Sequence, residues 1–95
     1  MKVLIEQEIV FTDYAAVFEK AIDLASLMPI GSLLFFNHND GDLDACEIKG
    51  YRWHESSQQI VATCKAQKDD GPIPHDFKEW MIANGWAVTY GGRLP

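Results

Sequence analysis

Cysteine and basic residues are scarce in this 95-residue chain. Its two cysteines, Cys46 and Cys64, are too few for a disulfide-stabilised scaffold. Both lie in strand-like runs, where a free cysteine packs as a small apolar residue. Eight Lys and Arg residues against fourteen Asp and Glu give a net charge of −6. That charge repels phosphate backbones and anionic lipid surfaces, so we expect no direct nucleic-acid binding and no membrane binding.

Long apolar runs and leader-like segments are also missing. No apolar stretch approaches the roughly 20 residues of a membrane-spanning helix. The first residues, MKVLIEQEIV, carry acidic side chains within their apolar run, which is not the pattern of a signal peptide. Together with the unpaired cysteines, these features predict a reduced, cytoplasmic protein.

Apolar and aromatic residues, by contrast, are abundant. Apolar residues make up 47% of the chain, which is enough for one modest core in a single domain spanning 1–95. Their periodicity predicts the order β-α-β-β-β-α-β. Strands are expected over 2–11, 30–37, 45–54, 59–67 and 86–90, and helices over 13–28 and 74–84. The expected fold class is α+β, a two-layer sandwich in which both helices pack on one face of a mainly antiparallel sheet.

Three local signals refine this prediction. The strand over 30–37 is apolar on both faces, which predicts a central position in the sheet. The apolar phase of the next strand changes at Gly50, which indicates a β-bulge. Gly85 is a natural left-handed C-terminal cap for the second helix, and Asp76 and Glu79 fit a capping box at its start.

The predicted topology brings several polar loops to one end of the sheet. A right-handed crossover followed by a meander opens the loops around Asp13, 38–44 and 67–75 at the same edge, together with Arg93. We therefore expect an acidic edge at that end. Its side chains are His38, Asp40, Asp42, Asp44, Asp69, Asp70 and His75.

The loop NHNDGDLD, residues 37–44, is the strongest metal-like pattern. Its alternating carboxylates resemble the opening of an EF-hand, but Ala45 and Tyr51 stand where that loop requires Gly and Glu. Asp40-Gly41 is a strong hairpin-turn pair, so a polar turn is the preferred interpretation. A looser Ca²⁺ or Mg²⁺ site stays an alternative, and with it a metal-assisted hydrolase; the metal ligands are unknown.

Catalytic motifs are otherwise missing from the sequence. There is no nucleophile elbow, no P-loop and no dinucleotide-binding glycine pattern. His75-Asp76 could form a base and its orienting partner, yet Asp76 is better explained as a helix cap. We assign no catalytic residue, expect no cofactor, and expect binding rather than catalysis.

The expected order of helix, three strands and helix over 12–84 resembles that of double-stranded-RNA-binding domains. Those domains carry a basic cluster at the start of the second helix, where this chain has Pro74-His75-Asp76. The resemblance is therefore limited to element order and implies no RNA binding. An acidic fold can instead imitate a phosphate backbone and inhibit a basic protein, which is the second functional hypothesis.

The aromatic residues carry the preferred hypothesis. They are more numerous than so small a core needs, and such residues are enriched at interfaces and in ligand pockets. The predicted ligand or interface residues are Tyr51, Trp53, Trp80, Trp86 and Tyr90. We therefore predict a homo-oligomeric binding protein, with a small molecule or another protein as its partner. An edge strand could pair across the dimer axis.

Overall fold

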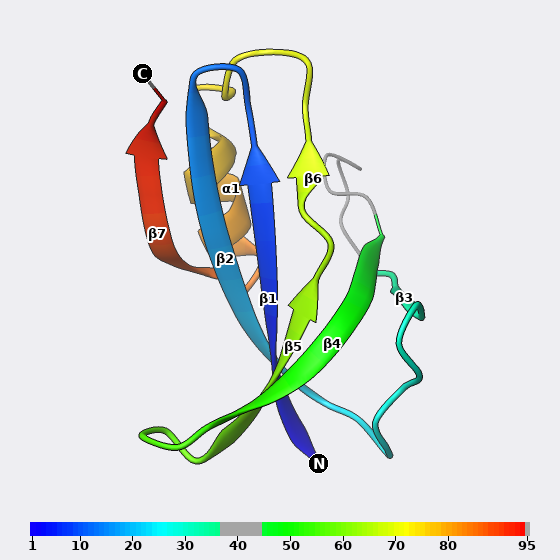
Figure 1. Ribbon diagram of the computed structural model, residues 1–95. Helices are drawn as coiled ribbons and strands as arrows, with labels where there is room; N and C mark the ends of the chain where they lie inside the picture. Colours follow the sequence, from blue (N-terminus) through cyan, green and yellow to red (C-terminus); the bar gives the residue numbers. More distant parts are fainter. Residues whose placement is uncertain (37–44, 95) are drawn as a thin grey trace.

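The computed structural model describes residues 1–36 and 45–94 as a curled, mostly β half-barrel with one short helix (Figure 1). Its elements are β1 Lys2–Val10, β2 Tyr14–Asp23, β3 Leu33–Leu34, β4 Cys46–His54, β5 Gln59–Cys64, β6 Gln67–Lys68, α1 Phe77–Ala83 and β7 Ala87–Arg93. The strand order is β3-β4-β5-β1-β2-β7, and β6 continues alongside β1. β5 and β6 pair with β1 in parallel, whereas the other described pairs are antiparallel. The predicted α+β sandwich with two helices is therefore wrong.

The largest correction concerns the segment predicted as a helix over 13–28. Residues Tyr14–Asp23 form β2, which pairs with β1 on one side and with β7 on the other. Phe18 and Ala16 alternate inward and are fully buried, whereas Val17 and Glu19 face the opposite side. The backbone groups of this segment are thus satisfied by two neighbouring strands instead of by a helix. The resemblance in element order to RNA-binding domains disappears with the helix.

The second correction concerns the segment predicted as a central strand over 30–37. Only Leu33 and Leu34 are paired there, and β3 lies at the sheet edge beside β4. Leu34 packs against the core, whereas Ile30 and Phe35 are exposed. The apolar pattern of this segment therefore does not reflect burial on both faces, because Ile30, Leu33 and Phe35 are exposed at the sheet edge.

The bulge predicted at Gly50 is confirmed. The register between β4 and β5 shifts between Ile48 and Gly50, so Lys49 is the extra residue on β4. The shift turns Ile48 into the core on one side of the bulge and leaves Trp53 outside on the other. It also accompanies the curvature of β4 seen in Figure 1.

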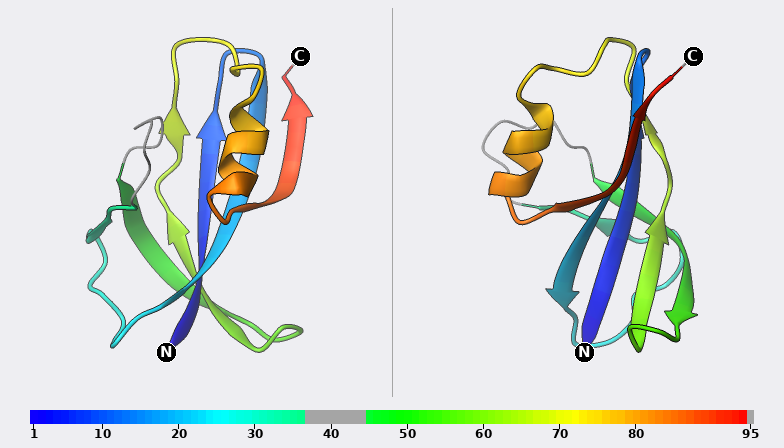
Figure 2. Two further views of the ribbon diagram at one scale, coloured as in Figure 1. Left: turned by 180° about the vertical axis from the view of Figure 1, so that it is seen from behind. Right: turned by 90° about the vertical axis from the view of Figure 1, so that its left-hand side faces the viewer.

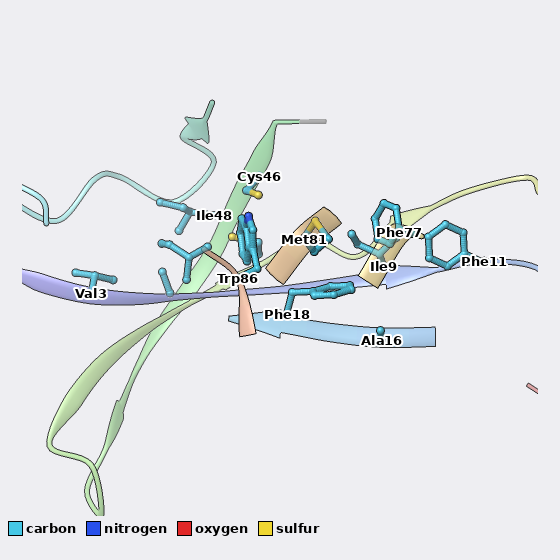
Figure 3. Close-up of a cluster of buried hydrophobic side chains, with 13 residues drawn as sticks. Val3, Ile9, Phe11, Ala16, Phe18, Cys46, Ile48, Phe77, Met81 and Trp86 are labelled. Carbon is cyan, nitrogen blue, oxygen red and sulfur yellow. The ribbon is translucent and has the colours of Figure 1, made fainter. Parts of the chain in front are cut away.

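The core lies between the sheet and α1, on the face that the helix covers (Figure 2). Phe77 of α1 packs edge-on against Phe11 and Phe18, with ring centroids 5.1 and 5.8 Å apart. Figure 3 shows these rings beside Met81 and Trp86, over the inward side chains of β1 and β2. Two residues of α1, Phe77 and Met81, are buried in this core, so the helix contributes to the apolar burial that stabilises the fold.

The end of α1 forms as predicted. Gly85 has a φ of 89°, which few other residues adopt, and the Trp86 backbone N–H donates to the Met81 carbonyl at 3.0 Å. The Gly85 N–H donates to Ile82 at 3.0 Å, which completes a Schellman motif. The predicted capping box does not form, since Asp76 makes no side-chain capping bond. In the part of the chain that the structure describes, no helix is long and apolar enough to cross a membrane.

Candidate functional site

A pocket of about 450 Å³ lies at the end of the sheet where the β1–β2 turn, the start of α1 and the end of β7 meet. Its volume falls in the usual range for small-molecule sites. The lining residues are Asp13, Tyr14, Ile73, Pro74, His75, Lys78 and Arg93. The other described hollows are less than half as large.

Backbone bonds from three segments build this end of the molecule. Thr12 donates its N–H to the Gly71 carbonyl at 3.1 Å, and Leu94 donates to the Asp13 carbonyl at 3.0 Å. The Asp13 carboxylate accepts the Ile73 N–H at 2.9 Å. Asp13 therefore ties the β1–β2 turn to both the loop before α1 and the end of β7. The pocket walls are held by two backbone hydrogen bonds and by the Asp13 carboxylate, all of which form without a ligand.

Tyr14 lines the pocket and lies between Gly91 and Lys78. A Cβ atom at Gly91 would overlap the Tyr14 hydroxyl, so the ring has its place only because position 91 has no side chain. On the other side the Lys78 ammonium lies 4.9 Å from the ring centroid and 3.3 Å from the hydroxyl. This cation–π contact orients Lys78 toward the pocket.

The pocket is cationic although the chain is acidic. Lys78 and Arg93 line it. Among the described residues, neither side chain has a carboxylate within 4.0 Å, and the ion pairs that do form are Arg52–Glu6 and Lys49–Glu47. His75 adds an imidazole to the same wall. The Asp13 carboxylate already accepts a backbone hydrogen bond. Chemically, the site presents an Arg fork, an ammonium and a phenol to whatever enters.

The acidic edge is placed only in part. Residues 37–44, which include His38, Asp40, Asp42 and Asp44, lie outside the described residues. Asp69 accepts the Gly71 N–H at 3.0 Å, Asp70 is exposed, and His75 lines the pocket. Among the described residues, no three His, Cys, Asp or Glu side chains lie close enough together to hold a metal ion.

The five predicted aromatic residues are dispersed in the structure. Trp86 is buried and packs edge-on against Phe36, at 5.2 Å between centroids. The half-buried Tyr51 donates its hydroxyl to the Met28 carbonyl at 2.6 Å. Trp80 is half-buried on α1, Trp53 is exposed beside Glu55, and Tyr90 is exposed on β7. No described pocket gathers them, so a role in ligand binding stays a prediction for each.

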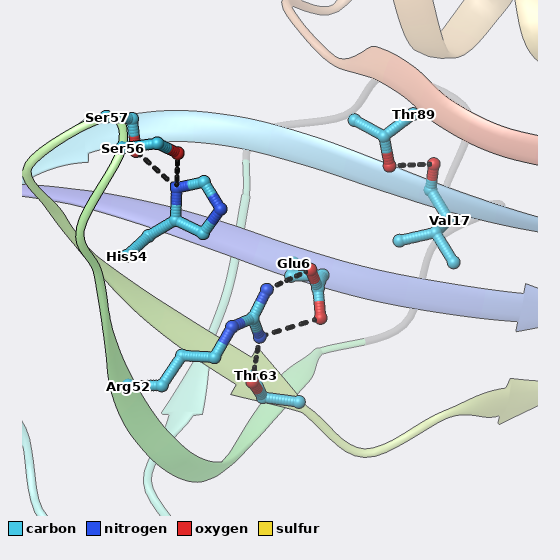
Figure 4. A network of polar contacts seen from close by, with 8 residues as sticks. All are labelled: Glu6, Val17, Arg52, His54, Ser56, Ser57, Thr63 and Thr89. Atoms are coloured by element: carbon cyan, nitrogen blue, oxygen red, sulfur yellow. Dashed lines mark hydrogen bonds and ion pairs between the residues drawn. The ribbon is translucent and has the colours of Figure 1, made fainter.

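A second polar cluster lies on the opposite face of the sheet (Figure 4). Arg52 on β4 contacts Glu6 on β1 at 2.8 and 3.1 Å and donates to the Thr63 hydroxyl of β5 at 2.9 Å. The hydrogen bond from Arg52 lowers the pKa of Glu6 below its ordinary value, against the opposing effect of burial. Because both terminal guanidinium nitrogens of Arg52 and both carboxylate oxygens of Glu6 are bonded within the sheet, this cluster is a cross-strand brace.

The two cysteines are free and buried, as predicted. They lie on the adjacent strands β4 and β5. A hydrogen bond with Cys64, together with burial, raises the pKa of the Cys46 thiol. A buried thiol with a raised pKa is a poor nucleophile, so Cys46 acts as a core residue.

Comparison with known proteins adds no relative: no family model, no curated protein and no solved structure matches the chain. The site therefore rests on its own geometry. Tyr14 and Lys78 were not predicted as site residues. Arg93 was expected at this end of the sheet, but its role was not. One signal in the sequence could have pointed to Lys78 as a site residue. His75 and Lys78 are three residues apart, a spacing that brings side chains together on a helical turn.

Proposed function

We propose that this protein binds a small anion in the pocket beside Tyr14. The observation that supports the proposal is the presence of Lys78 and Arg93 in the largest described pocket, with no described carboxylate to neutralise either cation. Neighbouring cations repel each other, and an anionic ligand between them removes that repulsion. In this chain of net charge −6, the one carboxylate that lines the pocket is that of Asp13, which accepts the Ile73 N–H and forms no ion pair with Lys78 or Arg93 among the described residues.

The chemistry of the wall favours a carboxylate or phosphate group. Arg93 offers a planar fork that matches two oxygens of either group, and Lys78 adds a point charge. The Tyr14 hydroxyl, 3.3 Å from the Lys78 ammonium, offers a further donor. Ile73 and Pro74 provide an apolar wall for the remainder of a ligand.

This proposal keeps the small-molecule partner predicted from the sequence and changes the site. The predicted aromatic residues are replaced by Tyr14, His75, Lys78 and Arg93. Inhibition of a basic protein by the acidic surface remains an untested alternative, and so does a hydrolase that uses the 37–44 loop. Neither has a specific contact among the described residues in its support.

Titration with inorganic phosphate at low ionic strength, followed by amide chemical shifts, tests the proposal. We expect saturable shifts at Tyr14, Lys78 and Arg93. Arg93→Gln and Lys78→Gln should each weaken binding about tenfold or more, since each removes a charge-assisted hydrogen bond.

Lys49→Gln is the matched control, because it removes one positive charge from β4, away from the pocket. An equal loss of affinity in Lys49→Gln would indicate general charge attraction instead of a site. An absence of saturable shifts around Tyr14 with phosphate and with acetate would contradict the proposal.

A further inference from the structure

β7 is the outermost strand on its side of the sheet, and its free edge has no partner among the described residues (Figures 1 and 2). It is seven residues long, whereas the strand at the opposite edge, β3, has two. A free strand edge presents unpaired N–H and C=O groups that can pair with another chain. The β7 edge is therefore the longer template for strand addition.

Two of the usual protections of a free edge, lysine and proline, are missing from β7, whose bulge lies before Tyr90 and whose one charged side chain is Arg93. Proteins blunt such edges with lysine, proline or short strands, but Ala87–Arg93 contains neither residue type. Residues 80–95 contain no Asp or Glu, and Arg93 is their one charged side chain. Two copies of an acidic chain can thus approach along this edge without bringing carboxylates together.

The register of β7 defines which groups are available. The register with β2 shifts between Val17 and Phe18, which makes Thr89 the extra residue, and Tyr90–Arg93 pair regularly beyond it. The Leu94 N–H points inward to the Asp13 carbonyl. Because backbone groups alternate along an antiparallel strand, Gly91 and Arg93 point their N–H and C=O groups outward, and Gly92 points inward.

We propose that a second copy of this chain pairs with β7 in antiparallel fashion, with the two-fold axis at Gly92. Gly91 then exchanges backbone hydrogen bonds with the partner's Arg93, and the reverse pair forms by symmetry. The Tyr90 side chain falls beside the partner's Leu94 on the same face of the extended sheet.

Side-chain exposure agrees with this register. Tyr90 is 64% and Leu94 40% exposed in the single chain, and both are apolar enough to benefit from mutual contact. Gly91 has no side chain to obstruct the partner's Arg93, which lies opposite it. The dimer therefore covers Tyr90 and Leu94 of each chain. It also gives hydrogen-bond partners to the outward-pointing backbone groups of Gly91 and Arg93 in both chains.

Light scattering with size exclusion at low and high protein concentration tests the proposal. The wild-type mass should rise toward twice 10.7 kDa. Tyr90→Lys and Leu94→Lys should hold it at one chain, because each places a charge at the axis. Trp53→Lys is the matched control, since Trp53 is a similarly exposed aromatic, at 57%, on β4.

Amide hydrogen exchange tests the register even if a variant fails to fold. With rising concentration, exchange at Gly91 and Arg93 should slow, whereas Gly92, already paired with β2, should not change. A wild-type protein that stays monomeric at high concentration overturns the proposal. So does a dimer that survives Tyr90→Lys but dissociates in Ile30→Lys, which would place the interface at the opposite edge. Neither outcome bears on anion binding, which phosphate titration measures separately.

Discussion

The guanidinium of Arg52 reaches across β5 to hold the carboxylate of Glu6 on β1 by two hydrogen bonds, 2.8 and 3.1 Å long. Glu6 lies directly opposite Glu19 in the β1–β2 register, and two like charges in that position repel each other. Arg52 therefore neutralises a repulsion that the strand pairing creates. Figure 4 shows the pair with Thr63 beside it.

Loss of this brace should lower stability measurably. We expect Arg52→Gln to reduce the free energy of unfolding by about 1 kcal/mol, the upper range for a partly exposed ion pair, because Glu6 is left beside Glu19 without a cation. Urea unfolding measures the change. Lys49→Gln is the control, since its contact with Glu47 is 3.7 Å long and exposed, and it should have almost no effect. Equal effects of the two substitutions would contradict the assigned role of Arg52.

The same pair predicts a pH dependence. The pKa of Glu6 is lowered in the folded state from an ordinary value of 4.5 by its hydrogen bond with Arg52. A lowered folded pKa contributes stability above the unfolded value, and that contribution is lost as pH falls through the folded value. The stability difference between wild type and Arg52→Gln should therefore be constant at neutral pH and shrink below pH 4.5. A difference that grows on acidification would contradict this assignment.

Two alanines distinguish the strand from the predicted helix over 13–28. Ala16 is fully buried and Ala21 is exposed in β2, whereas the apolar face predicted for the helix, with Tyr14, Val17 and Phe18, includes Ala21 and not Ala16. Ala16→Gln should cost about 3 kcal/mol of stability, since it forces a polar side chain into a packed core. Ala21→Gln should change stability by less than about 0.5 kcal/mol. Urea unfolding of both variants would give the reverse order if this segment were helical.

Gly91 links the sheet to the pocket. Gly91→Ala should displace Tyr14, because the new methyl group would overlap its hydroxyl. We expect phosphate affinity to fall while the protein stays folded, with a change in the near-ultraviolet circular dichroism of Tyr14. Gly92→Ala is the matched control, since its nearest neighbour is the Tyr90 hydroxyl at 3.9 Å. Unchanged affinity in Gly91→Ala would remove Tyr14 from the binding site.

The helix prediction failed for a reason visible in the residues themselves. Tyr14, Phe18 and Ile22 are spaced by four, and a spacing of four keeps side chains on one face of a helix and of a strand alike. Ala15, Ala16 and Ala21 added helical propensity, which tertiary context overrides. β1 needed a neighbour on its second side, and nine paired positions with β2 provide it. No local pattern contains that requirement.

The prediction that Asp13, the 67–75 loop and Arg93 lie at one end of the sheet held although the predicted helix over 13–28 was wrong. The sequence placed Asp13, the 67–75 loop and Arg93 together by assuming a helix after the first strand. A tight β1–β2 turn brings Asp13 to the same end, because either element must start where β1 stops. The spatial outcome depended on the direction of β1 and not on the type of the next element.

The sequence by itself determined the local features of this protein: the strand over β1, the bulge at Gly50, the Gly85 cap and two unpaired, apolar cysteines. Each follows from the conformational limits or polarity of one or two residues. Tertiary structure decided the rest. It made β2 a strand, sent β3 to an edge, and closed Tyr14, Lys78 and Arg93 around one pocket. Those outcomes depend on which backbone groups find partners across many residues, a condition that only the assembled sheet can satisfy.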